Sequence, residues 1–208
     1  MQKTFILGVG AQKAGTTWLH GQLSKSESIN FGFRKEYHVF DVIEALEKSV
    51  KGKQPVGRYE KIINSIATNC EGSDFIHQQT LAKPLKHALL ELAFIKDTSI
   101  YFNYFINLAT SDPKCEAVGD ITPSYALLNK TTLLNIKSSL EESGLRPRVI
   151  FLMRDPIERI WSSARMKKRE LPESSSKNFD MISPFLLFSY GYAMWQCLMA
   201  MPYGKAIW

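Results

Sequence analysis

The sequence is poor in cysteine and contains no long apolar run. Its three cysteines, Cys70, Cys115 and Cys197, form no CxxC pair and have no histidine at metal-ligand spacing, which argues against a disulfide framework or a zinc site. No segment approaches the ~20 apolar residues of a membrane-spanning helix, and the apolar run near the N-terminus is too short for a signal peptide. We therefore expect a cytoplasmic protein with buried, reduced cysteines and no membrane span.

Basic residues are in excess, but the sequence does not concentrate them. The 208 residues include 26 Lys and Arg against 20 Asp and Glu, a formal net charge of +6, which favours an anionic ligand only weakly. The dense Lys/Arg run or interleaved aromatics of a nucleic-acid-binding patch are missing, so we expect no nucleic-acid partner. The oligomeric state is not indicated. A hydrophobic share of 45% and this length are typical of one globular domain.

Two strand-to-helix units define the expected fold class. "TFILGV" (4–9) is a short apolar run ended by Gly10, and a helical pattern starts at Thr16. "RVIFLM" (148–153) is a second such run, and the helix after it has Pro156 in its first turn. Buried strands followed by helices predict an α/β protein, with a P-loop-like three-layer fold in which helices flank a central parallel sheet.

The rest of the chain is predicted to be mostly helical. The segment 99–109 is aromatic-rich and compatible with helix or strand, and we favour helix. The final stretch "MPYGKAIW" resembles the beginning of another strand, so we expect a single domain over 1–208 that continues beyond Trp208. The other expected elements are helices at 41–50, 58–67, 83–95, 131–144 and 184–201, a strand at 115–120 before a turn at Thr122–Pro123, and a polar loop at 170–180.

The first strand leads into a glycine loop, "GAQKAGTT". Gly10 and Gly15 have the spacing of a nucleotide triphosphatase loop, but Thr16 stands where that loop carries its lysine, and the lysine is instead Lys13. The dinucleotide pattern is also broken, because Lys13 replaces its third glycine. A glycine loop that opens a helix still directs backbone N–H groups at an anion. The alternative is an ordinary strand-to-helix turn with an exposed lysine.

Three further stretches accompany the loop "GAQKAGTTWL" (10–19), namely "KEYHVFD" (35–41), "GDITPSY" (119–125) and "RDPIERIWS" (154–162). Together the four resemble sulfotransferases that use 3′-phosphoadenosine 5′-phosphosulfate (PAPS), especially the heparan-sulfate and bacterial branch. "GAQKAGTTWL" resembles the 5′-phosphosulfate loop, "KEYHVFD" the Lys-Glu-x-His-Phe-Phe-Asp stretch, "GDITPSY" the Glu-x-Thr-Pro-x-Tyr segment, and "RDPIERIWS" the 3′-phosphate motif. All four occur in the family's order. The resemblance implies a sulfotransferase with PAPS as co-substrate, 3′-phosphoadenosine 5′-phosphate (PAP) as product, no metal, and a hydroxyl or amine acceptor that could be a carbohydrate.

The resemblance also implies two anion sites for the donor. Lys13 would contact the oxygen that bridges phosphate and sulfate, where negative charge develops as the S–O bond breaks. The planar fork of Arg154 suits a phosphate, and Ser162 would add a hydroxyl from the next helix. The alternative for Arg154 is a helix-capping turn with an exposed ion pair. The implied donor-binding residues are Gln12, Lys13, Ala14, Gly15, Thr16, Thr17, Arg154 and Ser162.

On the acceptor side, Glu36 aligns with the carboxylate that the heparan-sulfate enzymes use as a general base, and His38 with its neighbouring histidine. Two residues apart in an extended segment, both side chains would project to one side. Lys35 could hold the carboxylate ionised or be solvated. Lys13, Glu36 and His38 are therefore the expected catalytic residues. The expected acceptor contacts are Pro123, Ser124 and Tyr125, within walls formed by the helical region 42–110.

Two departures leave the acceptor open, and two other functions compete. Asp120 replaces the family's usual glutamate, and Ile121 stands where some heparan-sulfate enzymes have a substrate-contacting lysine. A small P-loop kinase would need a lysine at position 16 and an acidic residue after the second strand, where this chain has Arg154. A non-catalytic nucleotide-binding remnant is the third interpretation.

Overall fold

The computed structural model describes residues 2–49 and 75–170. The helix expected at 58–67 and the elements expected after residue 170 lie outside these ranges. The described elements, in chain order, are β1 (Thr4–Gly10), α1 (Thr16–Leu23), β2 (Ile29–Asn30), α2 (Val39–Ser49), α4 (Phe75–Lys96), α5 (Thr98–Ser111), β3 (Ala117–Ile121), the 3₁₀ helix η1 (Pro123–Leu127), α6 (Lys130–Glu142), β4 (Arg146–Phe151) and α7 (Pro156–Glu170).

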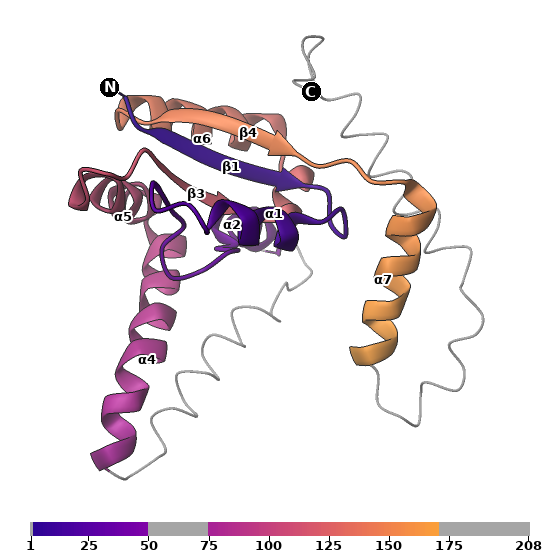
Figure 1. Cartoon of the computed structure of the whole chain (residues 1–208), viewed down its shortest axis with the longest axis horizontal. Helices are drawn as coiled ribbons and strands as arrows, with labels where there is room; N and C mark the ends of the chain where they lie inside the picture. Colours follow the sequence, from indigo (N-terminus) through magenta and orange to yellow (C-terminus); the bar gives the residue numbers. More distant parts are fainter. Residues whose placement is uncertain (1, 50–74, 171–208) are drawn as a thin grey trace.

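The described strands form one parallel sheet in the order β2-β3-β1-β4. Figure 1 shows β1 and β4 side by side, with their arrows pointing the same way. Helices pack on both faces of this sheet, so the expected α/β fold with a central parallel sheet is confirmed. Because parallel strands end at the same edge, the segments that follow β1, β3 and β4 are brought together there.

The two faces of β1 belong to two apolar clusters. Phe5, Leu7 and Val9 point into the larger cluster, whereas Ile6 points into the smaller one, where Leu19 and Leu23 of α1 pack. This alternation is that of a strand covered on both sides, and it explains why "TFILGV" is apolar throughout.

Helix α5 confirms the helical interpretation of the aromatic-rich segment 99–109. Its buried residues recur at the spacing of one helix face, and an edge-to-face contact joins Phe105 to Phe5 of β1, with ring centroids 5.0 Å apart. Such aromatic pairs add stability beyond their buried area. The buried residues of this face are Tyr101, Phe102, Phe105 and Ala109.

Strand β4 differs from its prediction in position and burial. It spans Arg146–Phe151, two residues earlier than the apolar run suggested, and it lies at an edge of the described sheet with Val149 61% exposed. The prediction that this strand is buried is therefore wrong, because an apolar run alone does not distinguish a central strand from an edge strand. The short strand β2 was not predicted. Cys115 is buried and free, as expected of a reduced cysteine.

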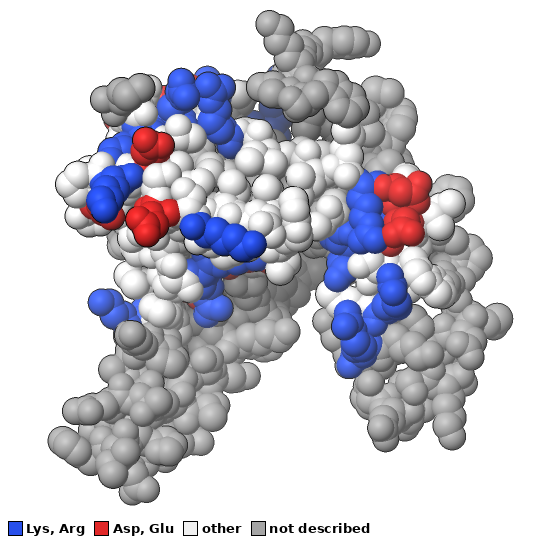
Figure 2. All heavy atoms as spheres, in the orientation of Figure 1, with Lys and Arg blue, Asp and Glu red and all other residues white. Residues whose placement is uncertain are grey.

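Basic side chains are spread over the described surface. On the face that Figure 2 shows, Lys and Arg occur in separate groups, and some of these groups lie beside Asp and Glu. Among the helices in the described ranges, none combines the length and apolar character that crossing a membrane requires.

Candidate functional site

The loop between β1 and α1 has the backbone geometry of an anion-binding turn. Gly15, the N-cap residue of α1, has a φ of 104° and provides no side-chain cap. Glycine adopts this left-handed conformation without the strain that a Cβ would cause. The N–H groups of Thr16 and Thr17 lie in the first helical turn, where no helical acceptor is available. These groups can therefore donate to an anion.

The ends of β1 and β4 bring Arg154 to this loop. Pairing of the two strands continues past the sheet, since the Leu152 N–H donates to Gly10 O at 2.8 Å and the Ala11 N–H to Leu152 O at 3.0 Å. Arg154 follows, and its Nη1 donates to Lys13 O at 3.3 Å while its Nη2 pairs with Glu158 Oε2 at 2.5 Å. The exposed ion pair of the alternative interpretation is thus present, but the same guanidinium also reaches the loop.

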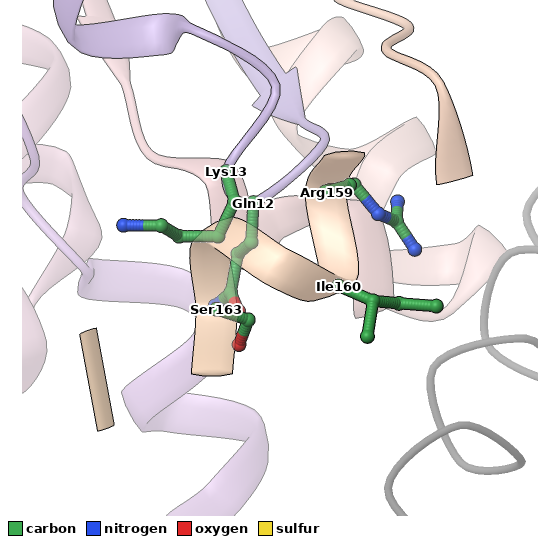
Figure 3. A pocket seen from close by; sticks show the side chains of 5 residues that line it. All are labelled: Gln12, Lys13, Arg159, Ile160 and Ser163. Carbon is green, nitrogen blue, oxygen red and sulfur yellow. The ribbon is translucent and has the colours of Figure 1, made fainter. Parts of the chain in front are cut away.

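The serine of α7 that lines a hollow beside the loop is Ser163, and Ser162 is not among the lining residues. A shallow hollow is lined by Gln12, Lys13, Arg159, Ile160 and Ser163, and in Figure 3 the Gln12 side chain runs toward Ser163 while Arg159 points away from the loop. Ser163 is 8% exposed. Ser162 therefore stays a predicted donor contact, and Ser163 is the serine of α7 that lines the hollow beside the loop.

The side chain of the loop residue Lys13 extends to α7. Its Nζ is 3.3 Å from the Met166 Sδ, and its φ is 63°. A thioether is a weak acceptor, so this contact leaves the ammonium able to move to an anion.

Glu36 and His38 lie together, as the two-residue spacing predicts. Glu36 Oε2 is 3.1 Å from His38 Nε2, and the other ring nitrogen, Nδ1, is 2.6 Å from Asp41 Oδ2. The Ser124 hydroxyl donates to the same Asp41 oxygen at 2.6 Å. We refer to Glu36, His38, Asp41 and Ser124 as the Glu36–His38 cluster. Sequence reasoning missed Asp41, although it ends the same "KEYHVFD" stretch.

Lys35 joins this cluster to the loop. Its Nζ lies 2.5 Å from Glu36 Oε1, 2.9 Å from Thr17 Oγ1 and 3.3 Å from Thr16 Oγ1. Burial by itself would raise the pKa of Glu36, but hydrogen bonds from His38 and Lys35, with the charge of Lys35, outweigh burial and lower this pKa to about 2. Glu36 is therefore ionised at neutral pH. Of the two alternatives for Lys35, the structure has the ion pair with this carboxylate and not a solvated lysine.

Of the three expected acceptor contacts, only Ser124 reaches the cluster. Pro123 and Tyr125 are buried, and the Tyr125 hydroxyl accepts from the Val39 N–H at 3.1 Å and donates to Asp120 Oδ2 at 2.9 Å. Tyr125 thus contacts the backbone beside His38 from the interior of the protein, and the acceptor contacts of all three residues stay a prediction.

Trp18 is an exposed aromatic residue in the first turn of α1. It directly follows the loop residue Thr17 and is 69% exposed, whereas Leu19 and Leu23 pack against the sheet. An exposed indole beside an anion loop offers a flat ring on which a nucleotide base can stack. Trp18 thus lies on the solvent side of α1, whereas the two leucines lie on the side that packs against the sheet.

No protein-family model and no curated protein matches this chain. Within residues 2–49 and 75–170, no three His, Cys, Asp or Glu side chains are grouped as ligands for a metal ion.

Proposed function

We propose that the protein is a sulfotransferase that moves the sulfuryl group of PAPS to a hydroxyl, or less readily an amine, of an acceptor. The observation that carries this proposal is the Lys35 bridge, which joins an anion-binding turn at Thr16 and Thr17 to the ionised carboxylate of Glu36. A transferase for an anionic group requires such an arrangement, with positive charge for the donor next to a group that takes a proton from the acceptor.

Two groups of residues would bind the anionic ends of the donor. The loop and the first turn of α1 offer N–H groups and hydroxyls for the 5′-phosphosulfate, and Arg154, 3.3 Å from Lys13 O, offers a planar fork for the 3′-phosphate. Trp18, exposed beside the loop, would stack on the adenine ring. Both anion sites lie at the carboxyl edge of the sheet, where open α/β folds bind ligands.

Lys13 and Glu36 would carry the chemistry. Lys13 places a positive charge near the loop, where it would neutralise the bridging oxygen as the S–O bond breaks. Glu36 would take the acceptor proton, and with a pKa of about 2 it is a weak base. The proton should therefore move late, after the attacking oxygen has begun to bond to sulfur and has become strongly acidic. Asp41 would fix the orientation of the His38 ring beside Glu36.

This proposal predicts that PAP raises the melting temperature of the protein more than AMP or ATP does, in the absence of magnesium. A ligand that binds the folded state stabilises it by about 2.7 kcal/mol at a hundredfold excess over its dissociation constant. The measurement is thermal unfolding at equal ligand concentrations. Equal shifts for AMP and PAP would argue against a 3′-phosphate site, and a magnesium-dependent preference for ATP would favour a P-loop kinase instead.

A further inference from the structure

Asp120 is a fully buried carboxylate that the chemistry above does not use. It lies in β3 and is 0% exposed, yet the structure gives it four donors. The Tyr101 and Tyr125 hydroxyls donate to Oδ2 at 3.0 and 2.9 Å, and the Thr122 hydroxyl and the Tyr37 N–H lie 2.5 and 3.3 Å from Oδ1. Burying a charged group is costly unless it is bonded in this way. Burial raises the pKa of Asp120 to about 6, although hydrogen bonds from Thr122, Tyr125 and Tyr101 act to lower it.

The contacts of Asp120 lead to the backbone on both sides of His38. Directly, its Oδ1 accepts from the Tyr37 N–H, which also donates to Thr122 Oγ1 at 3.0 Å. Indirectly, its Oδ2 accepts from the Tyr125 hydroxyl, and that hydroxyl accepts from the Val39 N–H at 3.1 Å. The N–H groups of Tyr37 and Val39, the residues on either side of His38, are thus linked to one buried carboxylate, the first directly and the second through the Tyr125 hydroxyl.

The conformation of His38 explains why this support is needed. Its φ is 54°, a left-handed value that is uncommon for a residue with a side chain. Such a conformation persists where the surrounding structure fixes it. Here it turns the chain from the segment that carries Glu36 into α2, and it leaves the His38 ring between Glu36 and Asp41.

We propose that Asp120 is a positioning residue for the Glu36–His38 cluster, acting on the Tyr37 N–H directly and on the Val39 N–H through Tyr125. A buried carboxylate suits this role because its acceptor directions fix donors on several segments at once. The consequence for turnover rests on the proposed function, whereas the consequence for the geometry of the cluster does not.

Two tyrosines provide a matched test. Tyr101 and Tyr125 are both 0% exposed, and each donates one hydrogen bond to Asp120 Oδ2. Tyr101→Phe and Tyr125→Phe therefore remove the same atom from similar surroundings, but only Tyr125→Phe removes the acceptor of the Val39 N–H. If Asp120 only stabilised the core, the two substitutions should affect the Glu36–His38 cluster to the same extent.

The readout is the titration of the His38 ring by NMR, with its signal assigned by its loss in His38→Gln. This titration depends on the distances of the ring from Glu36, Asp41 and Ser124, which face it. We expect the His38 midpoint to shift by about half a pH unit or more in Tyr125→Phe and to stay within about 0.2 units in Tyr101→Phe. Equal midpoints in the two variants would overturn the proposal.

A second pair keeps the test decisive if Tyr125→Phe does not fold. Thr122→Val removes the hydroxyl that donates to Asp120 and accepts from the Tyr37 N–H, and Thr122→Ser retains it. We expect the valine variant to shift the His38 titration and the serine variant to preserve it. If both titrate as the wild type does, the positioning role is refuted.

The outcomes also separate this inference from the proposed function. In an active protein, Tyr125→Phe should lower kcat about tenfold with little change in KM, and Tyr101→Phe should lower it less than about twofold. If the His38 titration shifts as expected but PAP does not bind, the positioning role stands and the sulfotransferase proposal is refuted. If PAP binds but the two tyrosine variants titrate alike, the positioning role is refuted and the function stands.

Discussion

Replacing Glu36 with glutamine is expected to lower turnover by roughly 10²–10⁴-fold, because it removes the group that takes the acceptor proton. The amide keeps the size of the side chain, and its one carbonyl oxygen can still accept from Lys35, which lies 2.5 Å from Glu36 Oε1, although its NH2 group cannot accept at the position of Oε2, 3.1 Å from His38 Nε2. Donor affinity should therefore not fall. The measurement is steady-state kinetics at saturating acceptor, together with a PAP titration of the variant.

Glu47→Gln is the matched control for this change. Glu47 is exposed on α2, the helix that begins directly after His38. Its replacement should leave turnover unchanged. If Glu36→Gln kept near-full turnover, Glu36 would be only the ion-pair partner of Lys35, and His38 would be the next candidate base.

Replacing Lys13 with alanine should lower turnover on the order of 10²–10³-fold, the usual cost of removing one contact to an oxygen that gains charge in the transition state. Unlike Glu36→Gln, this variant should also bind the donor more weakly. In the structure Lys13 contacts Met166, so the ammonium must turn from this weak acceptor toward the phosphosulfate. Turnover with labelled donor and a PAP titration would measure both effects.

Lys25→Ala is the control for Lys13. Lys25 follows α1, and its Nζ donates to Gln22 Oε1 at 3.0 Å in an exposed contact. Its removal changes the net charge equally and should change neither turnover nor donor binding. A Lys13→Ala variant that loses no more activity than Lys25→Ala would show that Lys13 only contributes to the general positive field of the protein.

Local patterns were sufficient to predict the features that depend on neighbours in sequence. The continuous apolar run of the buried strand β1 and the helical spacing of Tyr101, Phe105 and Ala109 can both be read from neighbouring residues. The approach of Glu36 and His38 is also local, since only one residue separates them, although the left-handed φ of His38 departs from the extended segment that the spacing suggested.

Features that depend on which strands are neighbours could not be predicted in this way. The contacts of Lys35 with Thr16 and Thr17, and the hollow that Gln12 and Ser163 line together, arise because segments far apart in sequence meet at one edge of the sheet. The exposure of Val149 could not be predicted either, because the apolar pattern of β4 does not reveal that this strand lies at an edge of the sheet within the described residues. The burial of Asp120 could likewise not be predicted, because its four hydrogen-bond donors come from several segments of the chain.

The central claim is that two anion sites, one in the loop after β1 and one at Arg154, bind the two ends of one donor. Calorimetric titration of PAP and AMP tests it most directly, in the wild type, in Arg154→Ala, and in Arg148→Ala as a control at an exposed arginine of β4. One charge-assisted phosphate contact contributes about 1.5–3 kcal/mol, so the wild type and Arg148→Ala should bind PAP more tightly than AMP by roughly tenfold or more. In Arg154→Ala this preference should fall to about one, through a loss of PAP affinity alone. A preference for PAP that survives Arg154→Ala, or a wild type that binds both nucleotides equally, would contradict the account.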